Sequence, residues 1–481
     1  MDYKNSPKAT EITMELPNTI EGCHTLIRSY HEIITTLSDR IDKLATENRE
    51  LKERLNNNSS NSSLPPSKSF KKLKLKKSAS KNKSGGQIGH EGHFRQLLDS
   101  KEVDVIVDCK LPSHCSCGGR INPSGDYQQH QVYELPEIKL EITEYHLEKG
   151  CCSCCGRNHI GILPDGITWG ITGPKLTGFM SHLISKYRLS RRELKEFLKE
   201  QFKFNISLGT LFNKQKIVNT ALEFSVSNLL TEVKQSPSIN IDETGHNRDG
   251  KKQWLWGLVS STVAFFSIQP SRGKKVLDLL VGDYENIIIS DRYTAYGYFD
   301  SSCRQICWAH LKRDFTRLSE KWDKGISRIG KGLLTCESDL FKVWYEFRQS
   351  NITRDELLRK TYPIRKRVGE LLEQGTYTDP KLKAVRFCKN LLEDFDALWT
   401  FLSIDNVEPT NNYAERYLRH SVIWRKKYFC TRSDYGSEYV ARTMSIIMTC
   451  RLQSRSSFEF ICQVLQNYFI KTTAPPFLIT A

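Results

Sequence analysis

Two short hydrophobic runs, each followed by an aspartate, constrain the fold of this chain more than any other feature. Residues 237–241 alternate polar and apolar side chains and lead into Asp242, and residues 286–290 are rich in isoleucine and lead into Asp291. Alternation and β-branched residues are typical of strands, so we expect both aspartates where a strand ends at the edge of a sheet. A third acid, Glu415, follows a proline and two asparagines that predict the start of a helix.

Carboxylates of this kind are the ligands that Mg²⁺ or Mn²⁺ prefers, together with phosphate groups of a substrate. Two such ions can stabilise the attacking and the leaving oxygen of an in-line phosphodiester displacement. The sequence therefore predicts metal-dependent phosphoryl transfer at Asp242, Asp291 and Glu415. Two alternatives remain open: the aspartates cap neighbouring loops, and Glu415 closes a capping box with Asn412.

The charge balance favours a polyanionic partner. The 481 residues include 71 Lys and Arg against 55 Asp and Glu, a net charge of +16, and double-stranded DNA is the partner that we expect. Fifteen cysteines in a large chain, whose first residues lack an apolar signal core, predict reduced thiols in the cytoplasm, with association with the nucleoid. The uncharged stretch at 253–271 is broken by polar residues, which predicts a β-hairpin and no membrane span.

Residues 20–55 carry a heptad repeat. Its a positions are Ile20, Ile27, Ile34, Ile41, Asn48 and Leu55, and its d positions are Cys23, Tyr30, Leu37, Leu44 and Leu51. This spacing predicts a coiled coil, and hence a homodimer or a higher oligomer, in which Asn48 fixes the register. The alternative is a single amphipathic helix that packs on its own globular body.

Residues 56–96 are predicted to be a basic, flexible linker. Asn and Ser residues and a proline pair end the helix. The lysines that follow include Lys71, Lys72 and Lys74, and we expect them to neutralise DNA phosphates. The alternative is an unstructured, solvated arm without a partner.

Residues 97–165 contain two short cysteine knuckles. The second offers Cys152 and Cys155, and the first offers either Cys115 with Cys117 or His114 with Cys117. Paired cysteines beside glycines are typical of a structural, tetrahedral Zn²⁺ site, which we favour over inert buried thiols. We expect two strands between the knuckles, and the identity of the first ligand stays open.

Residues 175–235 read as helices. Ser190 and Ser207 are candidate caps for two consecutive amphipathic helices, in the arrangement of a helix-turn-helix that binds DNA. A helical bundle without a DNA-binding role is the alternative.

Residues 236–470 predict a catalytic domain. Three consecutive strands, a helix and a fourth strand, with a fifth strand at 303–308, form the layout of a ribonuclease-H-like α/β core. A helical insertion at about 320–405 separates this core from Glu415. We expect Cys307 and His310 to pack and form hydrogen bonds near the acids. The whole chain is thus predicted to be a multidomain α+β protein.

Several motifs resemble those of the insertion-sequence-66 family of transposases over most of the chain. They are the Asn-Ser linker with its proline pair, the glycine-rich 85–93 segment, the paired knuckles, Asp291–Tyr296, Cys307–His310, and the 411–416 block with Arg425–Lys427 and Ser433–Gly436. The resemblance implies a DDE transposase in which Asp242, Asp291 and Glu415 hold the catalytic magnesium ions. Two positions depart from the family pattern: Arg292 stands where glycine is usual, and His114 replaces a cysteine.

An enzyme of this kind binds the ends of its mobile element, cleaves the DNA and joins the 3′-hydroxyl ends to target DNA. Helical spacing sets Glu415 on one stripe with Arg419 and Lys426, while Trp424 and its neighbours form a packing face. The basic residues expected to contact DNA on this helix are Arg416, Arg419, Arg425, Lys426 and Lys427. A non-catalytic DNA-binding regulator and a metal-dependent nuclease without strand transfer are the alternative functions.

Overall fold

The computed structural model describes residues 18–62, 91, 95–282, 284–377 and 382–472. The predicted contacts of Lys71, Lys72 and Lys74 with DNA lie outside these residues. The chain forms two compact units. The first consists of Met1–Leu73, Asp165–Ser190 and Phe212–Ala481, and the second consists of Lys74–Pro164 and Arg191–Leu211. The described helices and strands give a mixed α+β protein.

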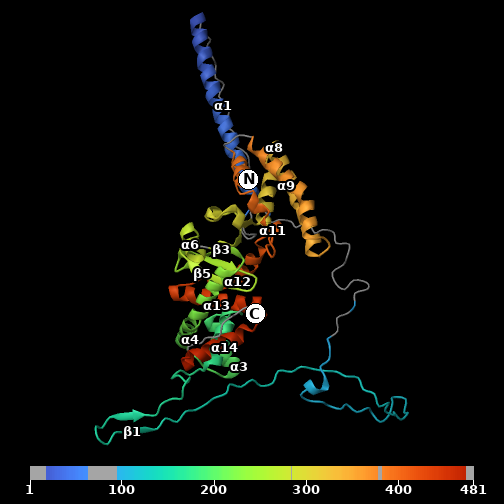
Figure 1. Cartoon of the computed structure of the whole chain (residues 1–481), viewed down its shortest axis with the longest axis vertical. Coiled ribbons are helices and arrows are strands. Elements are labelled where there is room, and N and C mark those ends of the chain that lie inside the picture. Colours follow the sequence, from blue (N-terminus) through green and yellow to red (C-terminus); the bar gives the residue numbers. More distant parts are fainter. Residues whose placement is uncertain (1–17, 63–90, 92–94, 283, 378–381, 473–481) are drawn as a thin grey trace. The chain divides into compact units, whose positions relative to one another are not determined.

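A five-stranded sheet forms the centre of the first unit (Figure 1). Its strands are β3 (Ser238–Arg248), β4 (Lys251–Val259), β5 (Ala264–Gln269), β6 (Ile287–Ser290) and β7 (Arg304–Ile306). Their order across the sheet is β5-β4-β3-β6-β7. Strands β3, β4 and β5 are antiparallel neighbours, whereas β6 runs parallel to β3 and β7 runs parallel to β6. Each strand lies in a segment where the sequence predicts one.

Strand β3 extends further than its hydrophobic run, and this corrects the expected position of Asp242. The strand continues to Arg248 because Asp249 and Gly250, both with positive φ (48° and 75°), form the two-residue turn of a hairpin with β4. Asp242 therefore lies within β3 instead of at its end. The parallel pairing with β6 does end beside it, since the last paired residue of β3 is Asn240.

Helix α13 (Asp434–Leu452) covers the edge strand β5. Its hydroxyl groups satisfy backbone groups of the strand. Ser445 Oγ accepts a hydrogen bond from the Phe266 amide at 2.9 Å, and Thr449 Oγ1 accepts one from the Ala264 amide at 3.0 Å. A paired, covered edge cannot add a foreign strand, which protects the sheet from edge-to-edge association.

Further helices of this unit precede, connect and follow the strands of the sheet. They are α2 (Pro174–Ser185), α5 (Glu223–Gln235), α6 (Lys274–Val281), α12 (Asn412–Tyr428), α14 (Ser457–Ile470) and the 3₁₀ turns η3 (Thr294–Tyr298) and η4 (Ser301–Cys303). The segment between β7 and α12 contains α7 (Trp308–Ser319), α8 (Lys324–Arg348), α9 (Arg354–Thr376), α10 (Lys383–Glu393), η5 (Asp396–Leu398) and α11 (Thr400–Ser403). It is helical where the sequence predicts an insertion. Its buried core is continuous with Ile289 of β6 and Ile306 of β7.

Helix α1 (Ile20–Asn56) occupies the heptad segment. Large apolar side chains at its a and d positions are exposed, from Ile20 (79%) to Leu55 (55%). At its last turn, Glu53 forms an ion pair with Lys321, and the Asn56 amide donates to Glu320 at 3.2 Å. Within the described residues the apolar stripe is left uncovered, which favours a coiled coil over packing on the chain's own body. Dimerisation itself stays a prediction.

The second unit has little regular structure. It contains η2 (Ser100–Glu102), β1 (Lys149–Cys151), β2 (Asn158–Ile160), α3 (Arg191–Phe202) and the first turn of α4 (Leu208–Ala221). The two strands expected between the knuckles do not form among the described residues 121–148. The short pair of β1 and β2 instead closes around the second knuckle itself. Ser207 caps α4 as predicted, since its Oγ accepts from the Thr210 amide at 3.0 Å. The DNA-binding role of these helices stays a prediction.

Candidate active site

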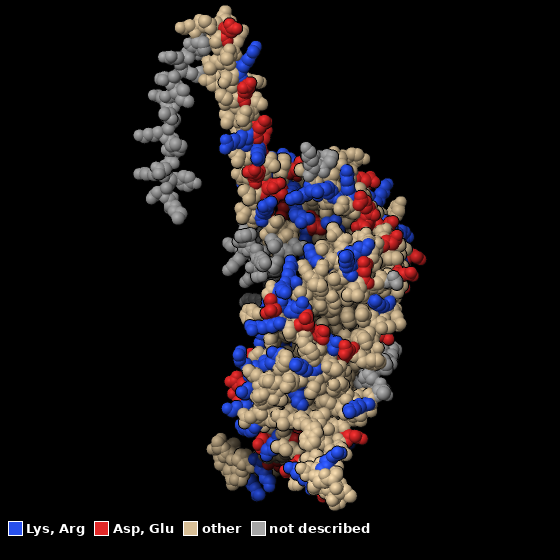
Figure 2. Space-filling model, turned by 90° about the vertical axis from the view of Figure 1, so that its left-hand side faces the viewer, with Lys and Arg blue, Asp and Glu red and all other residues tan. Residues whose placement is uncertain are grey.

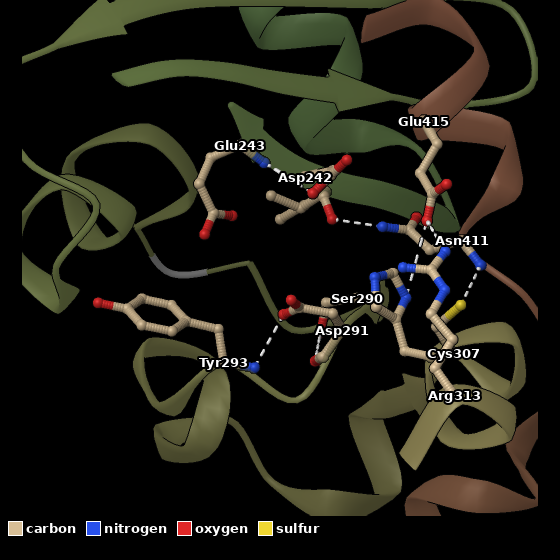
Figure 3. A network of polar contacts seen from close by, with 11 residues as sticks. Asp242, Glu243, Ser290, Asp291, Tyr293, Cys307, Arg313, Asn411 and Glu415 are labelled. Carbon is tan, nitrogen blue, oxygen red and sulfur yellow. Dashed lines mark hydrogen bonds and ion pairs between the residues drawn. The ribbon is translucent and has the colours of Figure 1, made fainter. Parts of the chain in front are cut away.

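The three predicted acids converge from three separate elements (Figure 3). Asp242 comes from β3, Asp291 follows the last residue of β6, and Glu415 lies in the first turn of α12. In Figure 3, Asp242 lies between Glu243 and Glu415, with Asp291 facing it. Residues far apart in the sequence therefore present carboxylates to one common space.

Backbone amides hold both aspartates in place. Asp242 Oδ1 accepts from the Glu243 amide at 2.9 Å, and Asp291 Oδ1 accepts from the Tyr293 amide at 2.8 Å. The parallel pairing of β3 with β6 brings the two strands side by side just before these residues. The position of Asp242 is thus set by strand β3, and that of Asp291 by the turn that follows β6.

Asn411 fixes the start of α12 against the sheet. Its buried Nδ2 donates to the Ile241 carbonyl at 2.7 Å, and its amide donates to Cys307 Sγ at 3.1 Å. Farther along the helix, Leu418 packs against Gly257 of β4, where an added Cβ would lie 3.2 Å from the leucine side chain. These contacts bring Glu415 beside Asp242. They also confirm the expected hydrogen-bonding role of Cys307.

Glu415 faces basic side chains instead of capping its helix. Its Oε1 lies 3.7 Å from His310 Nδ1 and 4.0 Å from Arg313 Nη2. This oxygen is buried and has no hydrogen-bond partner within the described ranges. The N-cap of α12 is Asn411, and the structure gives it no side-chain cap there. Asn412 and Glu415 therefore do not form the capping box that was the alternative role of Glu415.

Crowded negative charge marks the site electrostatically. Burial raises the pKa of Asp242 well above its ordinary range, and the charges of Glu243, Asp291 and Glu415 raise it further. Burial and the charge of Asp291 raise the pKa of Glu243 to about 7, although a hydrogen bond from Tyr296 and the charge of Arg272 oppose this. Burial is the largest cause of both shifts, and the negative charge of neighbouring acids adds to it.

Glu243 is a residue that the sequence analysis missed. Its side chain is 4% exposed, and Oε2 accepts from the Tyr296 hydroxyl at 2.8 Å. The available signal was its position directly after Asp242.

The carboxylates of Asp242, Asp291 and Glu415 suit a hard divalent cation, but they lie too far apart to coordinate one ion together. Carboxylate oxygens with raised proton affinity and an unpartnered Glu415 oxygen are what Mg²⁺ or Mn²⁺ would satisfy. In the part of the chain that the structure describes, no three His, Cys, Asp or Glu side chains approach closely enough to hold one ion. Metal binding at these acids thus requires the side chains to move together.

The basic residues of α12 divide into two groups. Arg416, Arg419, Lys426 and Lys427 are exposed, whereas Arg425 is half-buried and donates to Thr244 Oγ1 at 3.3 Å. Trp424 is buried on the predicted packing face. On the face drawn in Figure 2, Lys and Arg are scattered among Asp and Glu instead of forming one continuous basic surface. Contact between these residues and DNA stays a prediction.

The predicted zinc ligands lie in two separate turns. The Gly118 amide donates to the Cys115 carbonyl at 2.9 Å, and the Gly156 amide donates to the Cys152 carbonyl at 2.9 Å. Hydrogen bonds from Cys117 lower the pKa of Cys115, and backbone hydrogen bonds from Cys155 and Cys154 lower that of Cys152. The structure does not bring the four cysteines together among the described residues, so the zinc site, including the choice between His114 and Cys115, stays a prediction.

None of the described helices combines the length and the hydropathy that a membrane span needs. Comparison with known proteins gives two family matches. A model described as "Transposase IS66 family" matches residues 179–439, and a "Family of unknown function (DUF6444)" matches residues 5–96. The first match contains all three acids and covers more than half of the chain.

Two curated proteins of Sinorhizobium fredii (strain NBRC 101917 / NGR234) are similar to this chain. Uncharacterized protein y4hP is 22% identical over 408 residues, which cover 76% of this chain and 72% of the relative. Uncharacterized protein y4jD is 20% identical over 395 residues, with 76% of each chain covered. The similarity to both relatives therefore extends over about three quarters of the chain.

Proposed function

Since the chain belongs to the IS66 family of transposases, we propose that it binds the ends of its mobile element, cleaves them, and joins their 3′-hydroxyl ends to target DNA. The observation that carries this proposal is the convergence of Asp242, Asp291 and Glu415 from β3, β6 and α12. DNA is the substrate that a transposase acts on.

A ribonuclease-H-like core is part of the proposal. Supporting it are the strand order β5-β4-β3-β6-β7 and the mixture of three antiparallel strands with two parallel ones. Asp242 on the central strand and Asp291 after its parallel neighbour then lie just beyond the end of the parallel pairing of β3 with β6. The helical insertion separates Glu415 from this core in the sequence but not in space.

Asp242, Asp291 and Glu415 are the residues that would hold catalytic Mg²⁺ or Mn²⁺. Bound there, the ions would stabilise negative charge on the attacking and leaving oxygens of a phosphodiester displacement. The same three carboxylates serve cleavage by water and joining by a 3′-hydroxyl, because both reactions are in-line displacements at phosphorus. No covalent protein nucleophile is needed in this scheme.

The remaining side chains orient the reactants. Asn411 holds α12 against β3, so the position of Glu415 relative to Asp242 depends on its hydrogen bond to Ile241. Arg313 lies beside Glu415 and is suited to contact a phosphate oxygen. Arg419 and Lys426 lie along the exposed side of α12, where they would hold the backbone of the bound DNA.

A reaction with labelled DNA that carries the element's ends tests the proposal. We expect nicking at the 3′ ends and joined products with target DNA in Mg²⁺ or Mn²⁺, and neither product in chelator. Cleavage without joining would make the protein a nuclease. Binding to the ends without cleavage in either metal would make it a DNA-binding regulator.

The heptad helix predicts self-association. A peptide of residues 15–60 should be a helical, parallel dimer, and Asn48→Ile should raise its melting temperature while broadening its distribution of oligomers. Sedimentation equilibrium and circular dichroism measure both. A monomer at about 100 µM peptide, far above the usual dissociation constant of a five-heptad coiled coil, would refute the coiled coil.

The cysteine knuckles predict a structural zinc ion. Protein purified without chelator should carry about one zinc per chain, and Cys152→Ser with Cys155→Ser should lose it. Cys109→Ser, at an exposed cysteine outside both knuckles, is the matched control. Elemental analysis measures the zinc content. Wild-type protein without zinc would refute the prediction of a structural zinc ion at the knuckles.

A further inference from the structure

A row of alternating cations and aromatic rings lies beside the acids, and neither the family assignment nor the proposed chemistry accounts for it. Its members are Lys252, Trp254, Arg272 and Tyr293, which we term the stacking row. Lys252 Nζ lies 4.8 Å from the centre of the Trp254 ring. The Arg272 guanidinium lies 4.7 Å from the centre of the same ring and 3.9 Å from that of Tyr293.

The stacking row is attached directly to the candidate active site. The Tyr293 amide donates to Asp291 Oδ1 at 2.8 Å, and Arg272 Nη1 lies 3.8 Å from Glu243 Oε1. On β4, Trp254 is two residues from Trp256, which is paired in register with Glu243. Residues two apart on a strand share a face. The row therefore lies on the face of the sheet that carries Glu243, and it reaches the candidate active site through Glu243 and Asp291.

Its members are accessible. Lys252 is exposed, Trp254 and Tyr293 are half-buried, and the Arg272 side chain is 41% exposed. The residue paired with Trp254 on β3 is Gly245, which has no side chain to cover the indole ring. Trp256, by contrast, is fully buried and packs against Tyr296. The inner tryptophan thus belongs to the core, and the outer one faces solvent beside the site.

Half-exposed aromatic rings next to arginine and lysine are the chemistry by which proteins bind unpaired nucleic-acid bases. A base stacked on such a ring gains about 1–3 kcal/mol, and a neighbouring cation adds to the attraction. Paired bases inside a duplex do not offer their flat faces to protein rings. The row is therefore suited to a base that has left the duplex.

We propose that the stacking row binds an unpaired nucleobase of the DNA strand whose phosphodiester lies at the acids. The inference rests on the proposed function for the identity of the substrate. Binding of the base holds the strand end open and orients the adjoining phosphate toward Asp291. Arg272 lies beside Glu243 and contacts the rings of both Trp254 and Tyr293, so it keeps these rings at a fixed spacing.

A fluorescent base tests the proposal. The probe is a 20-base-pair duplex with a 3′ tail of five nucleotides. The first unpaired base of the tail is 2-aminopurine and the others are thymidines. The probe is mixed with full-length protein in Ca²⁺. Wild-type protein should quench the 2-aminopurine signal, and Trp254→Ala and Tyr293→Leu should abolish the quenching. They should also weaken binding of the tailed probe by about 5- to 100-fold, the loss of one stacked base, with blunt-duplex binding changed less than twofold.

Three further variants separate stacking from charge and from misfolding. Trp254→Phe keeps a ring and should keep most of the quenching, whereas Arg272→Lys keeps the charge but loses the planar group and should reduce it. Tyr362→Ala removes an exposed tyrosine (70%) of α9 and should behave as wild type. Equal quenching by Trp254→Ala and Tyr362→Ala would overturn the proposal.

The result is independent of cleavage. Asp242→Asn should still quench the probe, since that variant leaves the stacking row intact. Quenching by wild-type protein that cleaves no element ends would overturn the proposed function alone. Cleavage of element ends without quenching would overturn the stacking row alone.

Discussion

Replacing Glu415 by Gln should reduce end cleavage and strand transfer by about 100-fold or more while the protein stays folded and binds the ends. The substitution keeps the size of the side chain but removes the charge that a divalent ion requires. Electrostatic stabilisation by such an ion accounts for several kcal/mol of transition-state energy, which is the size of this loss. Cleavage of labelled ends in Mg²⁺ and a thermal melt measure the two quantities.

Glu408→Gln is the matched control. Glu408 lies before α12 and forms an ion pair with Arg348 of α8. Its side chain is 40% exposed, so loss of this pair should change stability by less than about 1 kcal/mol and leave cleavage unchanged. Substantial cleavage by the Glu415 variant, or a larger defect in the Glu408 variant, would mean that the third acid is wrongly assigned.

The second prediction concerns stability against pH in magnesium-free buffer. The pKa of Glu243 is raised from 4.5 to about 7 in the folded protein, so the folded state holds this proton more tightly than the unfolded state. Its contribution to stability is complete below about pH 4.5 and is lost as pH rises to about 7. The loss amounts to about 3 kcal/mol, and buried Asp242 acts in the same direction.

Two buried histidines act in the opposite direction. Burial lowers the pKa of His182 and His246 from 6.5 to about 4. Both histidines therefore stabilise the folded protein relative to the unfolded protein as pH rises toward 6.5. The comparison is therefore between wild type and Glu243→Gln, in which both histidines are unchanged. The variant should gain melting temperature relative to wild type between pH 5 and pH 8. If the difference in melting temperature between the variant and wild type stayed the same across that range, the raised pKa of Glu243 would be contradicted.

The fold and most of the candidate site could be predicted because their signals are local. Isoleucine-rich runs gave the strands before Asp291 and near Asp242, and the proline and asparagines gave the start of α12. The extension of β3 was missed because residues 242–248 are polar apart from Gly245 and show no alternation of polar and apolar side chains. Asp249-Gly250 was the available signal, since this dipeptide favours two-residue hairpin turns.

What could not be predicted depends on contacts between distant residues. Asn411 reaches Ile241 across 170 positions of sequence, and this hydrogen bond, instead of any helical pattern, brings Glu415 to the sheet. The neighbourhood of Glu243, Trp254 and Arg272 also depends on strand pairing, because β3 pairs with β4 and β4 pairs with β5, the strand that precedes Arg272. The knuckle turns could be predicted from Cys-Gly pairs, whereas the joining of both knuckles at one zinc ion stays a prediction.

The most direct test of the account is a count of divalent ions at the three acids by electron paramagnetic resonance of Mn²⁺. Wild-type protein should bind Mn²⁺ at a site that Mg²⁺ displaces. Asp242→Asn, Asp291→Asn and Glu415→Gln should each weaken that binding by at least about tenfold, because each removes one anionic ligand, while Glu408→Gln should bind as wild type. If all four variants bound Mn²⁺ as wild type does, Asp242, Asp291 and Glu415 would not form a metal site, and the proposed chemistry would be wrong.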